Sequence, residues 1–196
     1  MADVLTIRLW DDPVLSKVCD PVDETEFGPK LEEFGRQLLA TMDFKNGVGL
    51  AAPQVGVAKR MFVMHLPEHM DDRDYGVSPK APIVVCNPVL DLQGGSVYAR
   101  EGCLSLPNVF EQVSRAEKVV MRYRNPLGQE MAELTFDTQG TGITNARVAQ
   151  HEFDHLNGIM FFDYKDKRPT YGARMSKQVS KQVVRAWDKE KARYGR

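Results

Sequence analysis

The segment QHEFDHLNG, residues 150–158, constrains the fold of this chain more than any other stretch of its sequence. It places His151 and His155 four residues apart, with Glu152 directly after the first histidine. On a helix, side chains four residues apart lie on one face, roughly 6 Å from each other, so both histidines could bind the same metal ion. Glu152 would lie beside that ion, where a carboxylate can exchange protons with a water molecule. The pattern therefore predicts a helix over 145–158 that carries a metal site.

Two histidines do not complete a catalytic metal site, which has three protein ligands and an open position for water. Metalloproteases with the same His-Glu-x-x-His pattern take a third histidine six residues after the second, or a glutamate from a later helix. Here the first position is Phe161, and the only later glutamate is Glu190, within the charged C-terminal segment. Asp163 could serve as the ligand, although the apolar residues IMFF before it favour a strand that ends in a solvated acid.

Upstream of this helix, two histidines and three cysteines are candidates for the third ligand. His65 lies in a run of strand-forming residues and His69 in a polar stretch, which favours an ordinary strand or surface histidine at each position. Cys19 and Cys86 lie among ordinary apolar residues, where an unpaired cysteine usually fills space in the core. Cys103 lies in the tight sequence REGCLSLP, directly after Gly102. A site of two histidines and one cysteine, with water in the fourth position, would be catalytic rather than structural. Three unevenly spaced cysteines do not form a disulfide framework, which favours a reducing compartment such as the cytoplasm.

The size and charge of the chain suit one catalytic domain. It has 196 residues, 42% of them hydrophobic, which is enough for a single buried core. A net charge of −1 argues against general disorder and against a chain that only binds nucleic acid. The charge is uneven, since residues 165–196 contain eleven Lys or Arg and three Asp or Glu. No apolar run in the sequence reaches membrane-spanning length. From the size and the charge distribution we expect one domain over 1–196, whose residues 165–196 form a basic helical extension.

The periodicity of apolar residues predicts the remaining elements. They are an amphipathic helix at 29–43, strands at 60–66 and 83–92, a polar surface loop at 67–82, a β-hairpin from 118–124 and 130–136, and a last helix at 172–193. The turn of the hairpin is NPLGQ, in which proline and glycine separate two runs of strand-forming residues. Because no β-α-β rhythm is present, these elements predict an α+β fold, with antiparallel or mixed β-sheets around the central metal-binding helix.

Three segments together resemble the signature motifs of the peptide deformylase family, and they occur in the family's order. They are GVGLAAPQ at 47–54, EGCLS at 101–105 and QHEFDH at 150–155. The resemblance covers most of the chain, from DDPVL at 11–15 to FFDY at 161–164. It implies a metal-dependent hydrolase that removes the N-formyl group from the initiator methionine of nascent polypeptides and releases formate.

The resemblance also implies the metal site. The ligands of one divalent ion would be Cys103, His151 and His155. Ferrous iron is the metal expected natively, with nickel, cobalt or zinc able to substitute, and the ligand types by themselves do not choose iron over zinc.

The resemblance implies a catalytic role for three further residues. Glu152 would take a proton from the attacking water and pass it to the departing amine. The side-chain amide of Gln54 and the backbone N–H of Leu104 would stabilise the oxyanion of the reaction, each by about 3 kcal/mol.

A substrate-binding group is predicted as well, consisting of Val48, Gly49, Glu101, Thr144, Arg147 and Val148. Gly49 would let the backbone of the substrate approach closely, as an added strand does. Thr144 and Arg147 stand where the family often has Leu or Ile, which leaves the selectivity for the first side chain open.

Two acids beside ligands, Glu101 and Asp154, are expected to orient the site. Arginines could pair with these acids, and the candidates are Arg100 and Arg115. The alternative for each of the two is an ordinary solvated arginine on the surface.

Two other functions stay open on the residues alone. A metalloprotease-like peptide hydrolase would use Asp163 as its third ligand and would not need Cys103. A catalytically idle binding module would keep the metal for structure only.

The expected partners are the formyl-Met nascent peptide and the ribosome. In the basic extension, cationic side chains recur every four residues at Lys177, Lys181, Arg185 and Lys189. Such a stripe could contact the phosphates of ribosomal RNA. We expect no membrane or DNA partner and a cytoplasmic location.

Overall fold

The computed structural model describes residues 3–65, 81–137 and 144–163 of the chain. The predicted helix at 172–193 and the basic stripe lie outside the described residues. So does nearly all of the polar loop predicted between the first two strands.

Five strands pair in the order in which they follow one another along the chain, and each is antiparallel to the next. They are β1 (Gly49–Ala51), β2 (Met61–Met64), β3 (Ile83–Cys103), β4 (Leu106–Arg124) and β5 (Leu134–Asp137). Since two α-helices lie beside this sheet in the described part of the chain, the predicted α+β class is confirmed. The predicted hairpin is also confirmed, as β4 and β5 pair across a turn in which Gly128 has a φ of 85°.

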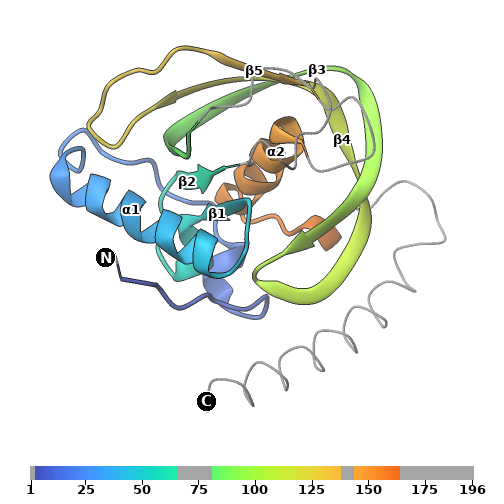
Figure 1. The fold of residues 1–196 in the computed structure, drawn as a ribbon, viewed down its shortest axis with the longest axis horizontal. Helices are drawn as coiled ribbons and strands as arrows, with labels where there is room; N and C mark the ends of the chain where they lie inside the picture. Colours follow the sequence, from blue (N-terminus) through green and yellow to red (C-terminus); the bar gives the residue numbers. More distant parts are fainter. Residues whose placement is uncertain (1–2, 66–80, 138–143, 164–196) are drawn as a thin grey trace.

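The two helices lie where the apolar spacing in 29–43 and the histidine spacing in 150–158 predicted them. Helix α1 (Pro29–Phe44) and helix α2 (Asn145–Leu156) are separated by the sheet, which curves around α2 (Figure 1). Thr144 caps the start of α2, because its hydroxyl oxygen accepts the N–H of Arg147 at 3.3 Å. Within the described residues, no helix combines the length and the apolar character needed to cross a membrane.

Strand β2 is buried on both faces and holds the two helices in place. Alternate residues of a strand point to opposite faces of its sheet. Phe62 and Met64 pack in the apolar cluster that includes residues of α2, whereas Met61 and Val63 pack in the cluster that includes residues of α1. Every residue of α2 except Phe153 is buried, so the polar residues of this helix must find partners inside the protein.

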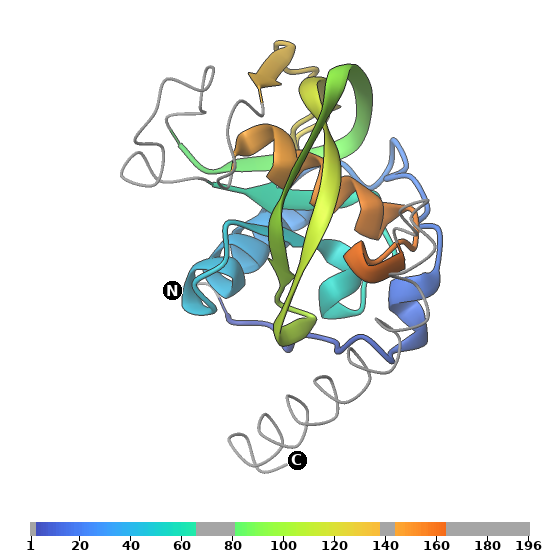
Figure 2. The ribbon, with the colours of Figure 1, turned by 90° about the vertical axis from the view of Figure 1, so that its right-hand side faces the viewer.

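Strand β3 is longer than the sequence predicted. The prediction ended at Leu92, before a glycine pair, but β3 continues to Cys103 and pairs with β4 over this extension. The register of the pairing shifts between Gln93 and Ser96, where Gly94 has a φ of 78°. The glycines therefore form a bulge, which bends and twists a strand without ending it. Figure 2 shows the resulting β3–β4 ribbon as it crosses α2.

The predicted strand at IMFF is wrong. Residues Phe161–Asp163 form a short 3₁₀ helix, η4. The carboxylate of Asp163 accepts the N–H of Met160 at 2.9 Å, and the Asp163 N–H donates to the Met160 carbonyl at 2.8 Å. This local pairing between an acid and the backbone competes with strand formation.

Candidate metal centre

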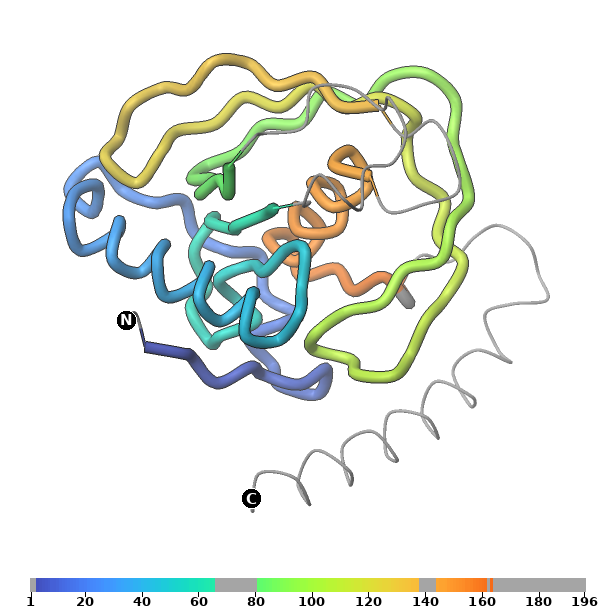
Figure 3. The backbone as a smooth tube through the Cα atoms, viewed as in Figure 1, coloured from blue at the N-terminus to red at the C-terminus, as the bar shows by residue number. Residues whose placement is uncertain are grey.

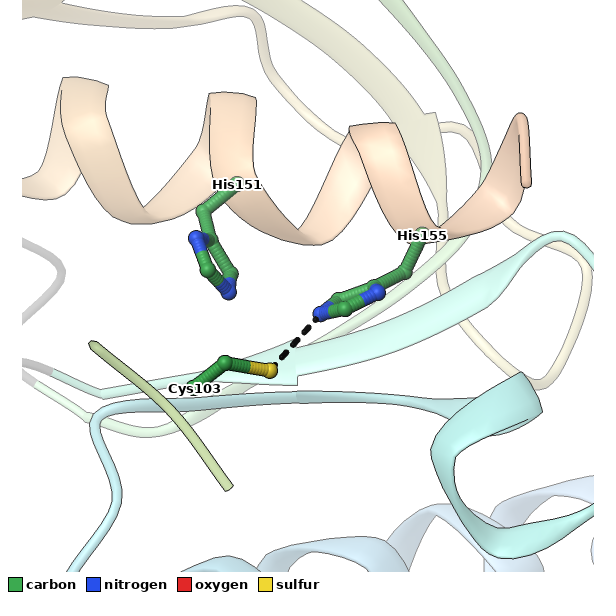
Figure 4. A group of neighbouring side chains, drawn as sticks. All are labelled: Cys103, His151 and His155. Carbon is green, nitrogen blue, oxygen red and sulfur yellow. Dashed lines mark hydrogen bonds between the residues drawn. The ribbon is translucent and has the colours of Figure 1, made fainter. Parts of the chain in front are cut away.

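The three predicted ligands come together from two elements. His151 and His155 project from α2 toward Cys103 at the end of β3 (Figure 4). One ligand atom from each of the three side chains lies within 4.8 Å of the other two, and the Cys103 Sγ is 3.3 Å from the His155 Nε2. In the part of the chain that the structure describes, no other His, Cys, Asp or Glu residues form such a group. One thiolate and two imidazoles make a donor set that suits a divalent transition metal.

Glu101 holds the ring of His151 from behind. Its Oε2 lies 3.0 Å from the His151 Nδ1, which leaves the other ring nitrogen to face a metal. The same carboxylate accepts two hydrogen bonds from Arg115, each 2.8 Å long, and one of 2.7 Å from Arg147. Burial by itself would raise the pKa of Glu101, but the hydrogen bonds from Arg115 and His151 hold this pKa below its ordinary value.

Arg115 is the arginine that the two acids need. It donates to Glu101 and forms a second ion pair with Asp154 on α2, and all three side chains are almost fully buried. Arg100 takes a different place, with its guanidinium 4.5 Å from the centre of the exposed Phe110 ring. The buried acids and arginines thus form one network that joins α2 to strands β3 and β4.

Glu152 has different surroundings. It is 4% exposed, and its Oε2 has no hydrogen-bond partner among the described residues. Burial raises the pKa of Glu152 to about 7. The carboxyl group packs against Gly49, because a Cβ atom at Gly49 would lie only 2.8 Å from the Glu152 Cδ. From the sequence we expected Gly49 to let the substrate backbone approach closely. Its contact with Glu152 was not predicted.

Gln54 lies across from α2, on the 3₁₀ helix η2 (Ala52–Val55). Its Nε2 is 3.3 Å from the Cys103 Sγ and 3.2 Å from the Ser105 Oγ, and its Oε1 accepts the N–H of Ala51 at 2.8 Å. Leu104 lies between Cys103 and Ser105 in the turn that joins β3 to β4. Sequence reasoning missed the contact with Ser105, because no local pattern links a turn residue to a side chain 51 positions away.

A cavity of about 1390 Å³ opens onto these groups. Its lining includes ten of the predicted site residues: Val48, Gly49, Gln54, Glu101, Cys103, Leu104, Arg147, Val148, His151 and Glu152. Thr144 and His155 are not part of the lining. The rest of the lining was not assigned to the site by the sequence, and it includes 4–9, 11–13, 44–47 and 107–110. Figure 3 shows the N-terminal segment as it passes the turn between β3 and β4, where the Trp10 N–H donates to the Ser105 carbonyl at 3.0 Å.

The guanidinium of Arg147 forms hydrogen bonds with groups inside the protein. Besides Glu101, it donates to the carbonyl of Val113 at 3.0 Å and to that of Val97 at 2.8 Å. Arg147 is 3% exposed. Its positive charge is therefore paired within the network, although the residue also lines the cavity.

Known proteins resemble this chain along most of its length. The family model for polypeptide deformylase matches residues 4–170. A peptide deformylase from Thermotoga petrophila is 40% identical over 158 residues, which cover 80% of this chain and 84% of the relative. The fold is similar to the crystal structure of peptide deformylase from Ehrlichia chaffeensis, with a TM-score of 0.79, 30% identity and coverage of 98% of this chain and 99% of that chain. It is also similar to the Met-Ala-Ser-bound class I type b peptide deformylase from Acinetobacter baumannii, with a TM-score of 0.68, 33% identity and coverage of 82% and 98%.

Proposed function

The chain belongs to the peptide deformylase family, and we propose that Cys103, His151 and His155 hold the metal ion on which this family of hydrolases depends. The protein is an enzyme that removes the N-formyl group from the initiator methionine of nascent polypeptides. The observation that carries the ligand assignment is the convergence of the three donor atoms within 4.8 Å. The hydrogen bond between His151 and Glu101 supports it further, because metal-binding histidines usually have such a partner.

Ferrous iron is the metal we propose for the native enzyme, and nickel, cobalt or zinc would occupy the same ligands. A divalent ion at this place would supply a Lewis acid that polarises the formyl carbonyl and makes water more acidic. One cysteine and two histidines bind all four metals, so the choice of iron rests on the family resemblance.

Glu152 moves the proton of the reaction. It takes the proton from the attacking water and passes it to the departing amine. Two observations support this role: the carboxyl group faces the cavity beside His151, and its Oε2 is free of partners among the described residues. A carboxyl group bound by arginines, as Glu101 is, would hold its charge instead of exchanging a proton.

Gln54 and Leu104 stabilise the negative charge that develops on the formyl oxygen. The Gln54 Nε2 is 3.3 Å from the Cys103 Sγ, and the backbone N–H of Leu104 belongs to the next residue. Donors fixed in a buried site need no reorganisation when the charge develops, which is why each can contribute about 3 kcal/mol.

The substrate lies in the cavity that these residues line. Val48 and Gly49 flank the peptide backbone, while Val148 and the stem of Arg147 line the space for the first side chain. Because the guanidinium of Arg147 is bound to Glu101 and two carbonyls, its charge is not available to the first side chain of the substrate. The geometry therefore favours an apolar first residue such as methionine. Glu101 contributes by holding His151, and Thr144 contributes by capping α2.

A protease site built on Asp163 has less support. The Asp163 carboxylate accepts the N–H of Met160 and is not among the side chains that converge with the two histidines. The Sγ of Cys103 occupies that place instead. An idle binding module is also disfavoured, because proton-carrying and oxyanion-stabilising side chains surround the same cluster.

We further propose a cytoplasmic enzyme, organised as one domain over 1–196, that meets its substrate at the ribosome. The basic stripe formed by Lys177, Lys181, Arg185 and Lys189 would contact ribosomal RNA, with an affinity that falls as salt rises. Replacing all four residues by Gln should weaken co-sedimentation with ribosomes at low salt and leave the activity on short formyl peptides unchanged. Ribosome binding equal to that of the parent would show that the stripe is only a solvated face.

The ligand assignment is tested by removing each cysteine in turn. Cys103→Ala should lose stoichiometric metal binding and formate release from a formyl-Met-Ala-Ser peptide. Cys19→Ala and Cys86→Ala are matched controls, since both residues are buried in the apolar clusters, and both variants should keep one metal ion per chain. A Cys103→Ala protein with full metal occupancy and activity would return the role of third ligand to Asp163.

A further inference from the structure

The carboxamide of Gln54 is held on three sides. Its Oε1 accepts the N–H of Ala51 at 2.8 Å, and its Nε2 lies 3.3 Å from the Cys103 Sγ and 3.2 Å from the Ser105 Oγ. A backbone N–H can only donate, so the group that faces Ala51 must be the oxygen of the amide. The NH₂ group consequently faces Cys103 and Ser105.

The two hydrogens of this NH₂ group have different surroundings. One points to the Cys103 Sγ, which lines the cavity, and the other points to the Ser105 Oγ, which is fully buried. A planar amide cannot turn one N–H without moving the other. The hydroxyl of Ser105 therefore determines where the cavity-facing N–H of Gln54 points.

The backbone fixes the distance between these two residues from both sides. The Arg8 N–H donates to the Gln54 carbonyl at 2.7 Å, and the Trp10 N–H donates to the Ser105 carbonyl at 3.0 Å. The same short stretch of the N-terminal segment thus ties η2 to the turn between β3 and β4. With both backbones held, the Ser105 hydroxyl is a fixed acceptor for the Gln54 amide.

We propose that Ser105 is a positioning residue for the deformylation reaction, which acts by aiming the Gln54 amide at the oxyanion. This inference rests on the proposed role of Gln54 as an oxyanion donor. Ser105 itself is 0% exposed and does not line the cavity, so it would act on the reaction without contacting the substrate. The direction of an oxyanion donor matters most in the transition state, so loss of the Ser105 hydrogen bond should act on the chemical step.

A double-mutant cycle on the metal-loaded enzyme tests whether Ser105 acts through Gln54. Ser105→Ala should lower kcat about tenfold and leave KM within about twofold, because the donor is used in the transition state. Gln54→Ala should lower kcat by about 10²–10³-fold, as is usual for an oxyanion donor. The double variant should match Gln54→Ala alone, since Ser105 has nothing left to position. Independent, multiplicative losses would overturn the proposal.

A second readout does not depend on activity. In the ¹⁵N-labelled, zinc-loaded full chain, the side-chain amide signals of Gln54 are identified by their absence from Gln54→Ala. In the parent these protons should exchange slowly with solvent, and in Ser105→Ala they should shift and exchange faster. Ser105→Cys, which replaces the oxygen by a weakly accepting sulfur, should move them in the same direction. Unchanged Gln54 signals in both variants would overturn the proposal whatever the kinetics.

The matched control removes a buried hydroxyl that has no contact with Gln54 or Ser105. Thr41 on helix α1 is 0% exposed, and its Oγ1 accepts the N–H of Leu5 at 2.8 Å. Thr41→Ala should lower the stability of the protein while kcat and the Gln54 signals stay at parent values. An equal effect of Thr41→Ala on either readout would mean that Ser105 acts only through general stability. If Gln54→Ala kept parental kcat, the donor role of Gln54 would fail, while the amide signals would still report whether Ser105 holds this side chain.

Discussion

Glu101 and Glu152 are two buried glutamates beside the same histidine, and they lie in contrasting regions of the molecule. Glu101 belongs to the network behind His151, where it is bound by two arginines and by the histidine ring. Both glutamates line the cavity, but the Oε2 of Glu152 has no partner among the described residues. Burial disfavours the charged form of both. Hydrogen bonds nevertheless lower the pKa of Glu101, whereas burial raises the pKa of Glu152 to about 7.

The contrast shows how one residue type serves two purposes. Network carboxylates and arginines balance one another in charge, so Glu101 stays ionised and fixes the orientation of His151. A carboxyl group whose pKa lies near neutrality can both accept and release a proton at working pH. The network thus provides a rigid frame, and the cavity face provides the group that changes its protonation state.

The largest effect is expected for Glu152→Gln, which tests the role of Glu152 directly. This substitution removes the proton carrier and leaves the ligands in place. Formate release should fall by about 10²–10⁴-fold, while metal content and the free energy of unfolding are retained. Metal analysis, urea unfolding and a formate assay check the three expectations. Glu111→Gln on β4 is the matched control, because Glu111 does not line the cavity and should keep full activity. A loss of less than tenfold in Glu152→Gln would count against the proton-carrying role.

Glu101→Gln should affect stability as well as the metal. Two buried arginines would lose a charged partner, and breaking a buried ion pair costs about 3–5 kcal/mol. Metal affinity should also fall by about 10–100-fold, because the His151 ring would lose its charged partner. Urea unfolding of the metal-free protein and competition with a chelator measure the two effects. A variant as stable as the parent would mean that the network is not the rigid frame of the site.

Arg147→Met sharpens the comparison within the network itself. Glu101 would keep its two hydrogen bonds from Arg115, so the free energy of unfolding should fall by only about 1–3 kcal/mol. Turnover of formyl-Met peptides should stay within a few-fold of the parent, since the guanidinium is directed away from the substrate. Steady-state kinetics with formyl-Met and formyl-Glu peptides provide the check. If the parent had a much higher kcat/KM for the formyl-Glu peptide than Arg147→Met has, the charge of Arg147 would reach the cavity after all.

The smallest perturbation is chemical labelling of the thiols. Burial raises the pKa of Cys19 to about 11 and that of Cys86 to about 12, and both are almost inaccessible. Cys103 lines the cavity. Iodoacetamide at mildly alkaline pH should therefore modify only Cys103 in the metal-free folded protein, and added zinc should prevent the reaction. Peptide mass spectrometry locates the label, and modification of Cys86 before unfolding would contradict the structure.

Local periodicity determined much of this protein. The apolar spacing in 29–43 and the histidine spacing in 150–158 both predicted helices that the structure contains, because a helix repeats within a few residues. The turn NPLGQ likewise predicted its hairpin. Cys103 stood out only as one candidate among several by its local sequence, and the family resemblance selected it.

Tertiary structure decided what depends on pairing between distant segments. The predicted strand ended at Leu92, before the glycine pair. In the structure, pairing with β4 extends β3 to Cys103. The sequence left the role of Arg147 in selectivity open, and in the structure its guanidinium binds Glu101 and two strand carbonyls. The contact between Gln54 and Ser105 joins residues 51 positions apart. Strand register and buried hydrogen bonds depend on which distant groups meet when the core closes, and local sequence does not contain that information.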